Sequence, residues 1–555
     1  MRLKPYLTTL FSTGLLIGLF PWIFSYRGVV FGLPVSIRAL GDALGFLMAL
    51  FGTLALFRPT MRERIKDFSL ALESLPNRKQ NLLIVAATLV FLIGVISHKL
   101  RAHAMLATHA YDLGFFSNIC WNTANGNWFF SSDLERNFMG VHVNWVLWPL
   151  SLVYRFWAGA PVLLVAQAVI MSAALPILWK AAQRITGYFV GGAVAALLLA
   201  SSPYFEHPLS NDFHPDVWLM PCLFAALWAW HAGRRALVLL FCALSLLAKE
   251  DVSVVLCGFA VMLFIQKNWR MTGAALMGIS LGAFYFHTQV MIPRYLEGSS
   301  PSLLFSRYPL LGANYQDFLH NMAFEPHRLL KAFAYEPSKY WRLFCYLLPM
   351  AGLSLLTPLL LLPPIISALP HILSQAGTQL SLADIYSLPA QPFLFIGAAM
   401  GAKKLIESKG TPWFGRFGGV LLVVAGFGVY NSPRYFKVEP AARIAAFKEA
   451  RALIPPLISL AAQHNLQPHF DTRRYIQLFP IRNSMVGLQR RYLENPDYIF
   501  ADRIGNGEPG TGVQLRAAIA ALEANPAYEK LFEKENFLVF VRRQPEEMRW
   551  ITLSS

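Results

Sequence analysis

Asp112 is a carboxylate whose position in the chain could support acid–base chemistry. It stands in the run Tyr111-Asp112-Leu113-Gly114, just beyond an apolar segment long enough to cross a membrane. A carboxylate at such a boundary, with aromatic neighbours, is partly removed from water, so that it can act as a base or hold a cation near a phosphate. The alternative is that Asp112 only caps a helix expected over 113–123.

Histidines and a second carboxylate follow at two further places. His142 could bind a phosphate or a sugar hydroxyl, or be an ordinary solvated loop residue. Asp212 and His214 stand in the run Asn211-Asp212-Phe213-His214-Pro215 and, together with Asp112, are candidate ligands of a divalent metal ion. Because zinc needs at least three protein ligands, Asp212 and His214 alone do not specify a metal, and a hydrogen-bonded turn is the alternative.

Lys249, Glu250 and Asp251 form a charged triplet between two apolar segments. Unpaired charge inside a membrane costs on the order of 3 kcal/mol or more, so the triplet needs a physical reason. Lys249 could meet an anionic ligand while Glu250 or Asp251 joins an outer polar site. The alternative is a self-neutralised loop between two short helices.

Arg307 belongs to a long polar segment, 292–340, in which basic residues alternate with tyrosines. Arginine binds phosphate oxygens with two parallel hydrogen bonds, so this composition suits a phosphate-bearing lipid headgroup or a glycan. An interfacial layer of snorkelling side chains explains the composition equally well.

The elements that must position these residues are apolar runs. The chain is 55% hydrophobic and only 14% charged, with a mean hydropathy of +0.44, whereas soluble domains carry about 25% charged residues. A helix needs about 20 apolar residues to cross a bilayer, and we expect roughly a dozen crossings (about 11–14). Their predicted ranges are 6–26, 37–57, 81–98, 161–179, 187–203, 215–231, 235–249, 251–266, 272–291, 341–357, 358–373, 389–402 and 415–431.

The positive charge is distributed as a membrane topology signal. The net charge of +17 comes from Lys and Arg in short breaks between apolar runs, which does not predict nucleic-acid binding. The positive-inside rule predicts a cytoplasmic N-terminus. The polar regions then expected on the outer side are 99–160, 204–214, 292–340 and 432–555. Five scattered cysteines predict no disulfide framework.

The chain therefore divides into three parts. Residues 1–60 predict an additional N-terminal pair of transmembrane helices, and 81–431 the main membrane domain. Residues 432–555 predict a small extracytoplasmic α/β domain. Its expected strands are 475–479, 498–501 and 537–541, with a helix over 513–524.

Three motifs in this order resemble one family: Tyr111-Asp112-Leu113-Gly114, Asn211-Asp212-Phe213-His214-Pro215 and Lys249-Glu250-Asp251. It is the predicted multipass membrane family of prokaryotes known as domain-of-unknown-function family two thousand and seventy-nine, which is similar to the GT-C superfamily of membrane glycosyltransferases. The resemblance runs from about Leu82 to the C-terminus. One position departs from it, because Ile385-Tyr386 stands where the family has His-Tyr.

The resemblance implies a mainly α, polytopic transmembrane bundle of GT-C type with a C-terminal α/β domain, in the bacterial inner membrane. It implies transfer of a hexose or pentose from a polyprenyl-phosphate donor to a cell-envelope glycan, lipid or protein acceptor on the outer face. Asp112 would be the base or a metal-linked centre. The substrate contacts expected are Tyr111, His142, Asp212, His214, Lys249, Glu250, Asp251, Arg307 and Tyr386.

Two other functions are compatible with many helices and intramembrane charge. The first is a transporter or lipid flippase, although no inverted repeat is evident and the polar residues collect on one face. The second is a non-catalytic membrane assembly protein, for which Asp112 and Lys249 would be dispensable.

Overall fold

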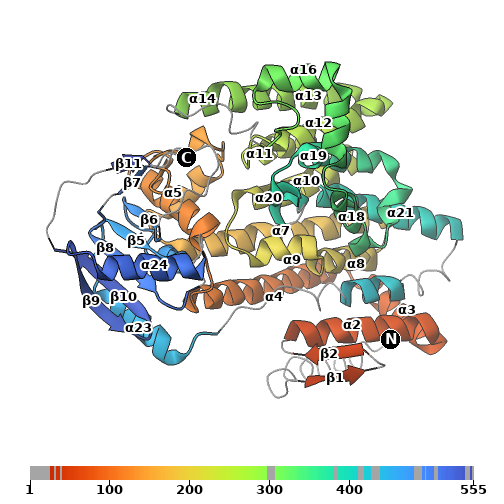
Figure 1. The fold of residues 1–555 in the computed structure, drawn as a ribbon. Coiled ribbons are helices and arrows are strands. Elements are labelled where there is room, and N and C mark those ends of the chain that lie inside the picture. The colour runs from red at the N-terminus through yellow and green to blue at the C-terminus, as the bar shows by residue number, and fades with distance from the viewer. Residues whose placement is uncertain are drawn as a thin grey trace.

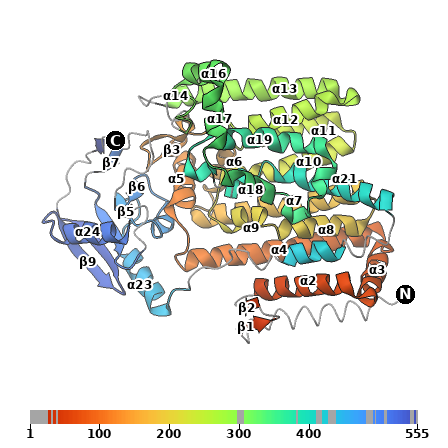
Figure 2. The ribbon, with the colours of Figure 1, turned by 45° about the vertical axis from the view of Figure 1, so that its right-hand side comes forward.

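The computed structural model describes residues 26–30, 33–37, 40–296, 307–380, 384–409, 418–426, 438–480, 491–493, 495–505, 511–543 and 550–552. It is mainly helical, with a helical bundle and a C-terminal domain built on a mixed sheet (Figure 1). Figure 2 shows the long helices running roughly parallel, with the C-terminal domain beyond one end of the bundle. This confirms the predicted fold class.

Many helices of the bundle overlap the predicted apolar runs, whereas others, such as α3, α5, α6, α16 and α17, lie outside them. Its helices up to the second outer loop are α2 (Leu40–Phe57), α3 (Pro59–Glu73), α4 (Asn77–Ala104), α5 (Phe115–Ala124), α6 (Leu147–Val153), α7 (Ala160–Thr186), α8 (Phe189–Ala200) and α9 (Pro203–Ser210). Those after it are α10 (Leu219–His231), α11 (Arg235–Ser245), α12 (Val252–Ile265), α13 (Arg270–Tyr285), α14 (Ile292–Tyr295), α16 (Tyr315–Phe324), α17 (Pro326–Ala334), α18 (Ser338–Cys345), α19 (Leu362–Leu373), α20 (Gly377–Leu380) and α21 (Gln391–Lys409).

Three stretches of helix in the described residues are long and apolar enough to cross a membrane alone. They are α4, α7 and the run Lys267–Tyr295, which contains α13. The helices α8 and α9 meet the same criteria as a pair, bent by 54° at the break between them. Other predicted crossings form shorter apolar helices such as α11 and α12. The predicted crossing 6–26 lies outside the described residues, and 415–431 is described only over 418–426.

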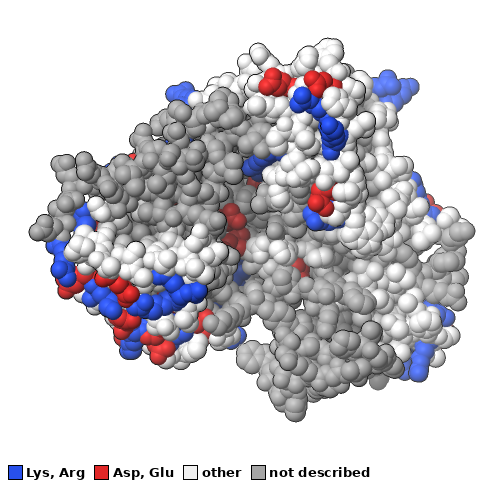
Figure 3. Space-filling view, viewed as in Figure 1, with Lys and Arg blue, Asp and Glu red and all other residues white. Residues whose placement is uncertain are grey.

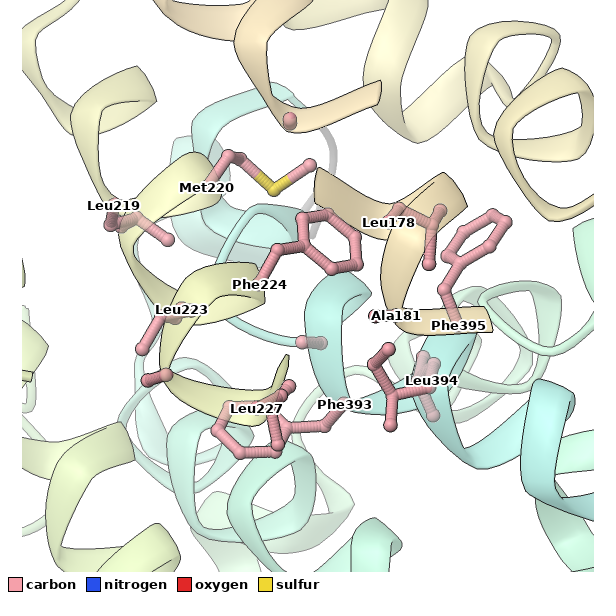
Figure 4. Packing of buried hydrophobic residues seen from close by; sticks show 14 of the residues in the cluster. Leu178, Ala181, Leu219, Met220, Leu223, Phe224, Leu227, Phe393, Leu394 and Phe395 are labelled. Atoms are coloured by element: carbon pink, nitrogen blue, oxygen red, sulfur yellow. The ribbon is translucent and has the colours of Figure 1, made fainter. Parts of the chain in front are cut away.

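The main core of the bundle lies between α7, α10 and α21. Figure 4 shows side chains of the three helices interdigitating, with Leu178 from α7, Phe224 from α10 and Phe393 from α21. A second close contact joins α12 to α19, where Gly258 lets the helices approach. A Cβ at this glycine would lie 2.8 Å from the Cα atom of Pro363. This packing fixes the helices whose outer ends carry the polar loops.

The C-terminal domain is a five-stranded mixed sheet in the order β6-β5-β8-β10-β9. Its strands are β5 (Leu460–Ala462), β6 (Ile476–Leu478), β8 (Tyr498–Asp502), β9 (Tyr528–Lys534) and β10 (Phe537–Arg542). The strand β5 pairs in parallel with β6 and β8, and β10 pairs antiparallel with β8 and β9. The predicted strands at 475–479, 498–501 and 537–541 are confirmed within one or two residues.

One helix covers each face of this sheet. Phe537 and Val539 of β10 pack with α23 (Ala441–Ala452), whereas Leu538 and Phe540 pack with α24 (Gly512–Glu523). This is the alternation of side chains expected of a strand buried on both faces. The layer with α23 also includes Leu106, which follows α4, so the domain packs against the first outer loop.

Three two-stranded sheets, β1-β2, β3-β4 and β7-β11, complete the described strands. The strands β1 (Tyr26–Val30) and β2 (Leu33–Ile37) pair antiparallel before α2, where the sequence pattern predicts no strand. The other strands are β3 (Phe130–Ser131), β4 (Arg136–Asn137), β7 (Arg491–Leu493) and β11 (Trp550–Thr552). In Figure 3 the described charged side chains gather over the C-terminal domain, and the bundle face in view is mostly uncharged.

Candidate active site

Asp112 lies in a backbone turn that few residues with a side chain adopt. It belongs to η1 (Ala110–Gly114), a π-helical turn between α4 and α5, with φ 66° and ψ −76°. These angles are those of the rare, strained form of the γ-turn. Such strain costs about 1–3 kcal/mol and is concentrated at functional sites. The Asp112 side chain is exposed, whereas Leu113 and Gly114 are buried.

Asp112 does not cap the helix that follows it. The N-cap residue of α5 is Gly114, which follows Asp112 by two positions. The helix-capping interpretation of Asp112 therefore gains no support. Its conformation must be held by contacts with the segments around it.

Two segments distant in sequence hold the residues on either side of this turn. The carboxylate of Asp212 accepts hydrogen bonds from the backbone N–H of His109, at 2.8 Å, and from its ring Nδ1, at 3.0 Å. The N–H of Ala110 donates to the carbonyl oxygen of His464 in the C-terminal domain, at 2.7 Å. The His464 ring also stacks on the His109 ring, with centroids 5.0 Å apart. We call the contacts of Asp212 with His109 and of His464 with Ala110 the Asp112 clamp.

The Asp212 loop is itself fixed from the bundle. The buried ammonium group of Lys99 donates to the carbonyl oxygens of Leu209, at 2.8 Å, and Asn211, at 2.6 Å. Gln167 of α7, also buried, accepts a hydrogen bond from the His214 N–H at 3.0 Å. These contacts place Asp212 against His109, as a hydrogen-bond acceptor.

The metal-ligand interpretation gains no support from this geometry. Asp212 is occupied by His109. In the described part of the chain, no group of three or more His, Cys, Asp or Glu side chains is arranged to hold a metal ion. Asp112, Asp212 and His214 thus share one region without forming a metal centre there.

The Lys249-Glu250-Asp251 triplet lies in the connection between α11 and α12. Lys249 is buried and its Nζ lies 3.6 Å from the Asp216 carboxylate and 3.2 Å from that of Asp251. Asp251 is half exposed. The triplet is not neutralised within itself, because Lys249 also pairs with a residue that the apolar segment 215–231 supplies.

Glu250 ties the triplet to the first outer loop. Its two carboxylate oxygens bind the His142 ring Nδ1, at 2.7 Å, and the Val143 N–H, at 3.0 Å. Burial opposes ionisation of this carboxyl group, but His142 and the Val143 N–H outweigh burial and hold the pKa of Glu250 below its usual range. The Val146 N–H also donates to the Leu247 carbonyl oxygen, at 3.0 Å.

His214 lies where the three loops meet. Its Nδ1 is 3.4 Å from a carboxylate oxygen of Asp216, and its ring meets the Phe116 ring edge-on at 5.4 Å. Burial disfavours the charged imidazolium, but Asp216 and then Asp112 outweigh burial and raise the pKa of His214, while Lys249 acts in the opposite direction. Asp112 and Lys249 therefore both lie within electrostatic range of one imidazole.

Arg307 and Tyr386 belong to a second wall of the same region. The Arg307 carbonyl oxygen accepts a hydrogen bond from the Gln375 N–H at 2.8 Å, which anchors this part of the long outer segment. The Tyr386 ring contacts the His371 ring of α19, with centroids 5.1 Å apart. Arg307 and Lys249 both interact electrostatically with His371. The contacts thus join Tyr386 to His371, and the Arg307 backbone to the segment that follows α19.

The C-terminal domain is bound to the first outer loop through buried polar contacts. Asn118 of α5 donates to the carbonyl oxygens of Asp471, at 3.1 Å, and Arg473, at 2.8 Å. The Ser132 hydroxyl and the Ile476 backbone exchange hydrogen bonds, both at 2.7 Å. Burial raises the pKa of Asp471 to about 7. The domain is thus an integral part of the region around Asp112.

Three residues of this region escape sequence reasoning. Asp216 follows His214 by two positions, so the spacing offers a signal for it, but the apolar segment 215–231 includes it. His371 lies within an apolar run, and only the fold brings its ring to Tyr386. His464 acts through its backbone carbonyl, which no side-chain pattern reveals.

The predicted site residues fall into two groups, those that support the backbone and those that are exposed. Tyr111 contacts the His464 ring, with centroids 4.9 Å apart, next to the Asp112 clamp. Asp212 and Glu250 hold backbone segments in place, whereas Asp112 and Asp251 are exposed at the surface of the site. The predicted residues therefore form one region with two kinds of role, support and exposed chemistry.

The comparisons with known proteins give one family model and several solved structures. Residues 102–539 match the model of DUF2079, described as a predicted membrane protein. Among solved structures, the chain is similar to ArnT from Cupriavidus metallidurans bound to undecaprenyl phosphate. The identity is 13%, the TM-score is 0.45, and the match covers 84% of this chain and 98% of that one. No curated protein matches the chain.

Proposed function

Because the chain belongs to the DUF2079 family of predicted membrane proteins, and the motifs around Asp112, Asp212 and Lys249 lie within the matched residues 102–539, we propose that it is a membrane glycosyltransferase. It transfers a sugar from a polyprenyl-phosphate donor to an acceptor hydroxyl on the extracytoplasmic face. The observation that carries this proposal is that Asp212 holds the turn of Asp112 through His109, and that the same loop continues to His214 and Asp216, with which Lys249 pairs. The exposed carboxylate of Asp112 and the buried cation of Lys249 thus belong to one site.

Asp112 is the base in this mechanism. It takes the proton of the acceptor hydroxyl, whose oxygen attacks the anomeric carbon of the sugar. The bond between that carbon and the phosphate oxygen breaks, and its electron pair leaves with the polyprenyl phosphate. The attack comes from the face opposite to the leaving phosphate, so the configuration at the carbon is inverted. The clamped turn of Asp112 presents the carboxylate in one orientation, which is what positioning a proton acceptor requires.

Arg307 is the cation that we assign to the departing phosphate. Lys249 already pairs with Asp216 and Asp251, so most of its charge is compensated within the protein. Its role is to hold Asp216, and through it His214, beside Asp112. Arginine can bind phosphate oxygens in a bidentate manner and stabilise the charge that develops on them. Tyr386 and His371 flank this place and would contact the donor.

The test uses the purified full-length protein in nanodiscs, supplied with polyprenyl-phosphate sugars and a panel of acceptors. Asp112→Asn should lower transfer at least about 100-fold, the lower end for loss of a general base. Its thermal unfolding should be unchanged because the side chain is exposed. The matched control is Asp317→Asn, an exposed carboxylate of α16 bonded to Asn314, which should keep full transfer.

Two results would contradict the proposal. Unchanged transfer in Asp112→Asn would remove Asp112 from the mechanism. Movement of the donor lipid across liposomes without any sugar transfer would support a transporter or flippase. The bent pair α8 and α9 is a feature that transporters share, but they use such breaks in matched pairs.

A further inference from the structure

A cleft of about 920 Å³ is lined by residues near the start of α4 and near the end of α7. Figure 2 shows these helix ends at the side of the bundle away from the C-terminal domain. Residues of α4, α7, α10 and α11 line it, among them Asn81, Lys180, Arg184, Trp228 and Phe241. Asn81 is near the start of α4, whereas the Asp112 turn follows the end of that helix. At 1.5 Å per residue, α4 separates the two by roughly 35 Å. The cleft is therefore distinct from the site around Asp112.

The mouth of the cleft carries cations that the protein does not pair with acids. The Lys180 ammonium group donates only to amide oxygens, at 2.5 Å to Asn81 and 3.2 Å to Gln183. Arg184 is exposed, and Arg234 lies over the Trp228 ring at 5.4 Å. In the part of the chain that the structure describes, none of Lys180, Arg184 and Arg234 forms an ion pair with a carboxylate.

The nearby carboxylate of Glu73 binds backbone N–H groups. The two oxygens of Glu73 accept hydrogen bonds from the N–H groups of Phe189, at 3.0 Å, and Val190, at 2.9 Å, at the start of α8. The positive charge at the cleft mouth is therefore left for an external anion.

The interior of the cleft is apolar. Pro176 and Ile177 of α7, Ala225 of α10 and Phe241 of α11 form its walls. Trp228 lies at the boundary between these walls and the basic mouth, which is the position that tryptophan prefers at a membrane interface. A ligand that fits must therefore combine an anionic head with a hydrocarbon chain, and basic clefts between transmembrane helices on the cytoplasmic side bind anionic lipid headgroups.

We propose that this cleft binds an anionic phospholipid of the bilayer, in the leaflet that the distribution of Lys and Arg predicts to be cytoplasmic. The phosphate is bound by Lys180 and Arg184. One acyl chain lies along Ile177 and Phe241. This site is independent of sugar transfer, because the two places are at opposite ends of α4 and α7.

The experiment measures lipid retention by native mass spectrometry of the full-length protein, exchanged into nanodiscs of phosphatidylglycerol mixed with phosphatidylcholine. The wild type should retain phosphatidylglycerol in preference to phosphatidylcholine. Lys180→Gln combined with Arg184→Gln should weaken that retention on the order of tenfold, given the usual contribution of a basic residue near an anionic lipid. The matched control, Lys267→Gln with Arg270→Gln, removes two exposed charges from another loop predicted on the same side.

A second variant separates the cleft from general surface charge. Ile177→Trp fills the groove and leaves Lys180 and Arg184 in place, so it should also displace the lipid. Thermal unfolding shows whether each variant is folded. Equal retention by wild type and the Lys180 and Arg184 variant would overturn the proposal. So would an equal loss in the Lys267 and Arg270 control, or equal retention of phosphatidylcholine, because either result would mean that the basic residues only snorkel to the interface.

Discussion

Replacing Asp212 by alanine should release one side of the Asp112 clamp. One oxygen of Asp212 accepts both hydrogen bonds from His109, at 2.8 and 3.0 Å, and only 12% of the Asp212 side chain is exposed. A hydrogen bond to a charged group contributes about 1.5–3 kcal/mol. Because the two bonds share one acceptor, we assign about 2–3 kcal/mol to the pair. This is as large as the strain of about 1–3 kcal/mol expected at Asp112.

Hydrogen–deuterium exchange of the peptide 105–116 measures this loss without relying on any enzymatic activity. In the wild type, the N–H groups of His109, Ala110 and Gly114 are all hydrogen-bonded. These amides exchange when the turn opens locally. A loss of about 2–3 kcal/mol raises the population of the open turn, and so the exchange rate, roughly 30- to 150-fold, since 1.4 kcal/mol is a factor of ten.

The comparison variants separate the clamp from general instability. Asp212→Asn keeps an oxygen that can accept the His109 N–H, so its effect should be intermediate. Asp317→Ala removes an exposed carboxylate from α16 and should leave the peptide 105–116 unchanged. If Asp212→Ala folds normally and this peptide exchanges at the wild-type rate, the carboxylate does not hold the turn. The contact with His464 would then be sufficient.

Three further outcomes follow from buried polar groups. Glu250→Ala should lower the free energy of unfolding by about 2 kcal/mol, because it leaves the His142 ring without its partner; thermal unfolding in nanodiscs tests this, and Glu250→Gln should cost less. The raised pKa of Asp471 means that the folded state binds a proton more tightly than the unfolded state. Its contribution is then fully present below the ordinary value of 3.8 and is lost as pH rises toward about 7. Asp471→Asn should abolish this pH dependence in unfolding curves. Arg443→Ala should destabilise the C-terminal domain by about 3–5 kcal/mol, since it removes the partner of the buried Asp502 carboxylate; limited proteolysis of the domain should accelerate, and an unchanged cleavage rate would contradict this.

Local patterns predict the elements that local physics determines. Long apolar runs predict α4 and α7, because a helix that crosses or fills the membrane satisfies its own backbone and needs only apolar side chains. The continuous apolar run from Phe537 to Val541 predicts β10, since both faces of the strand pack against helices. The expectation that the polar loops share one face also agrees with the contacts between His109 and Asp212 and between His142 and Glu250.

Contacts between distant segments are not predictable in this way. Asn118 contacts the backbone of Asp471 across 353 positions, and no periodicity relates the two residues. The turn at Asp112 is likewise invisible in its own sequence, because aspartate has no local preference for the γ-turn that would distinguish it from a helix cap. His371 stands in an apolar run of the sequence, which does not mark it as a site residue. Only the packing of α19 on α12 brings its ring to Tyr386.

The C-terminal domain helps to hold the strained turn at Asp112. A residue with φ 66° and ψ −76° returns to a relaxed conformation unless its neighbours prevent it. The membrane domain supplies one restraint through Asp212, and the C-terminal domain supplies the other through the carbonyl oxygen of His464. Because neither restraint greatly exceeds the strain alone, the orientation of the Asp112 carboxylate depends on the two domains being docked. Loosening their interface should therefore disturb Asp112 even when every residue of the turn is intact.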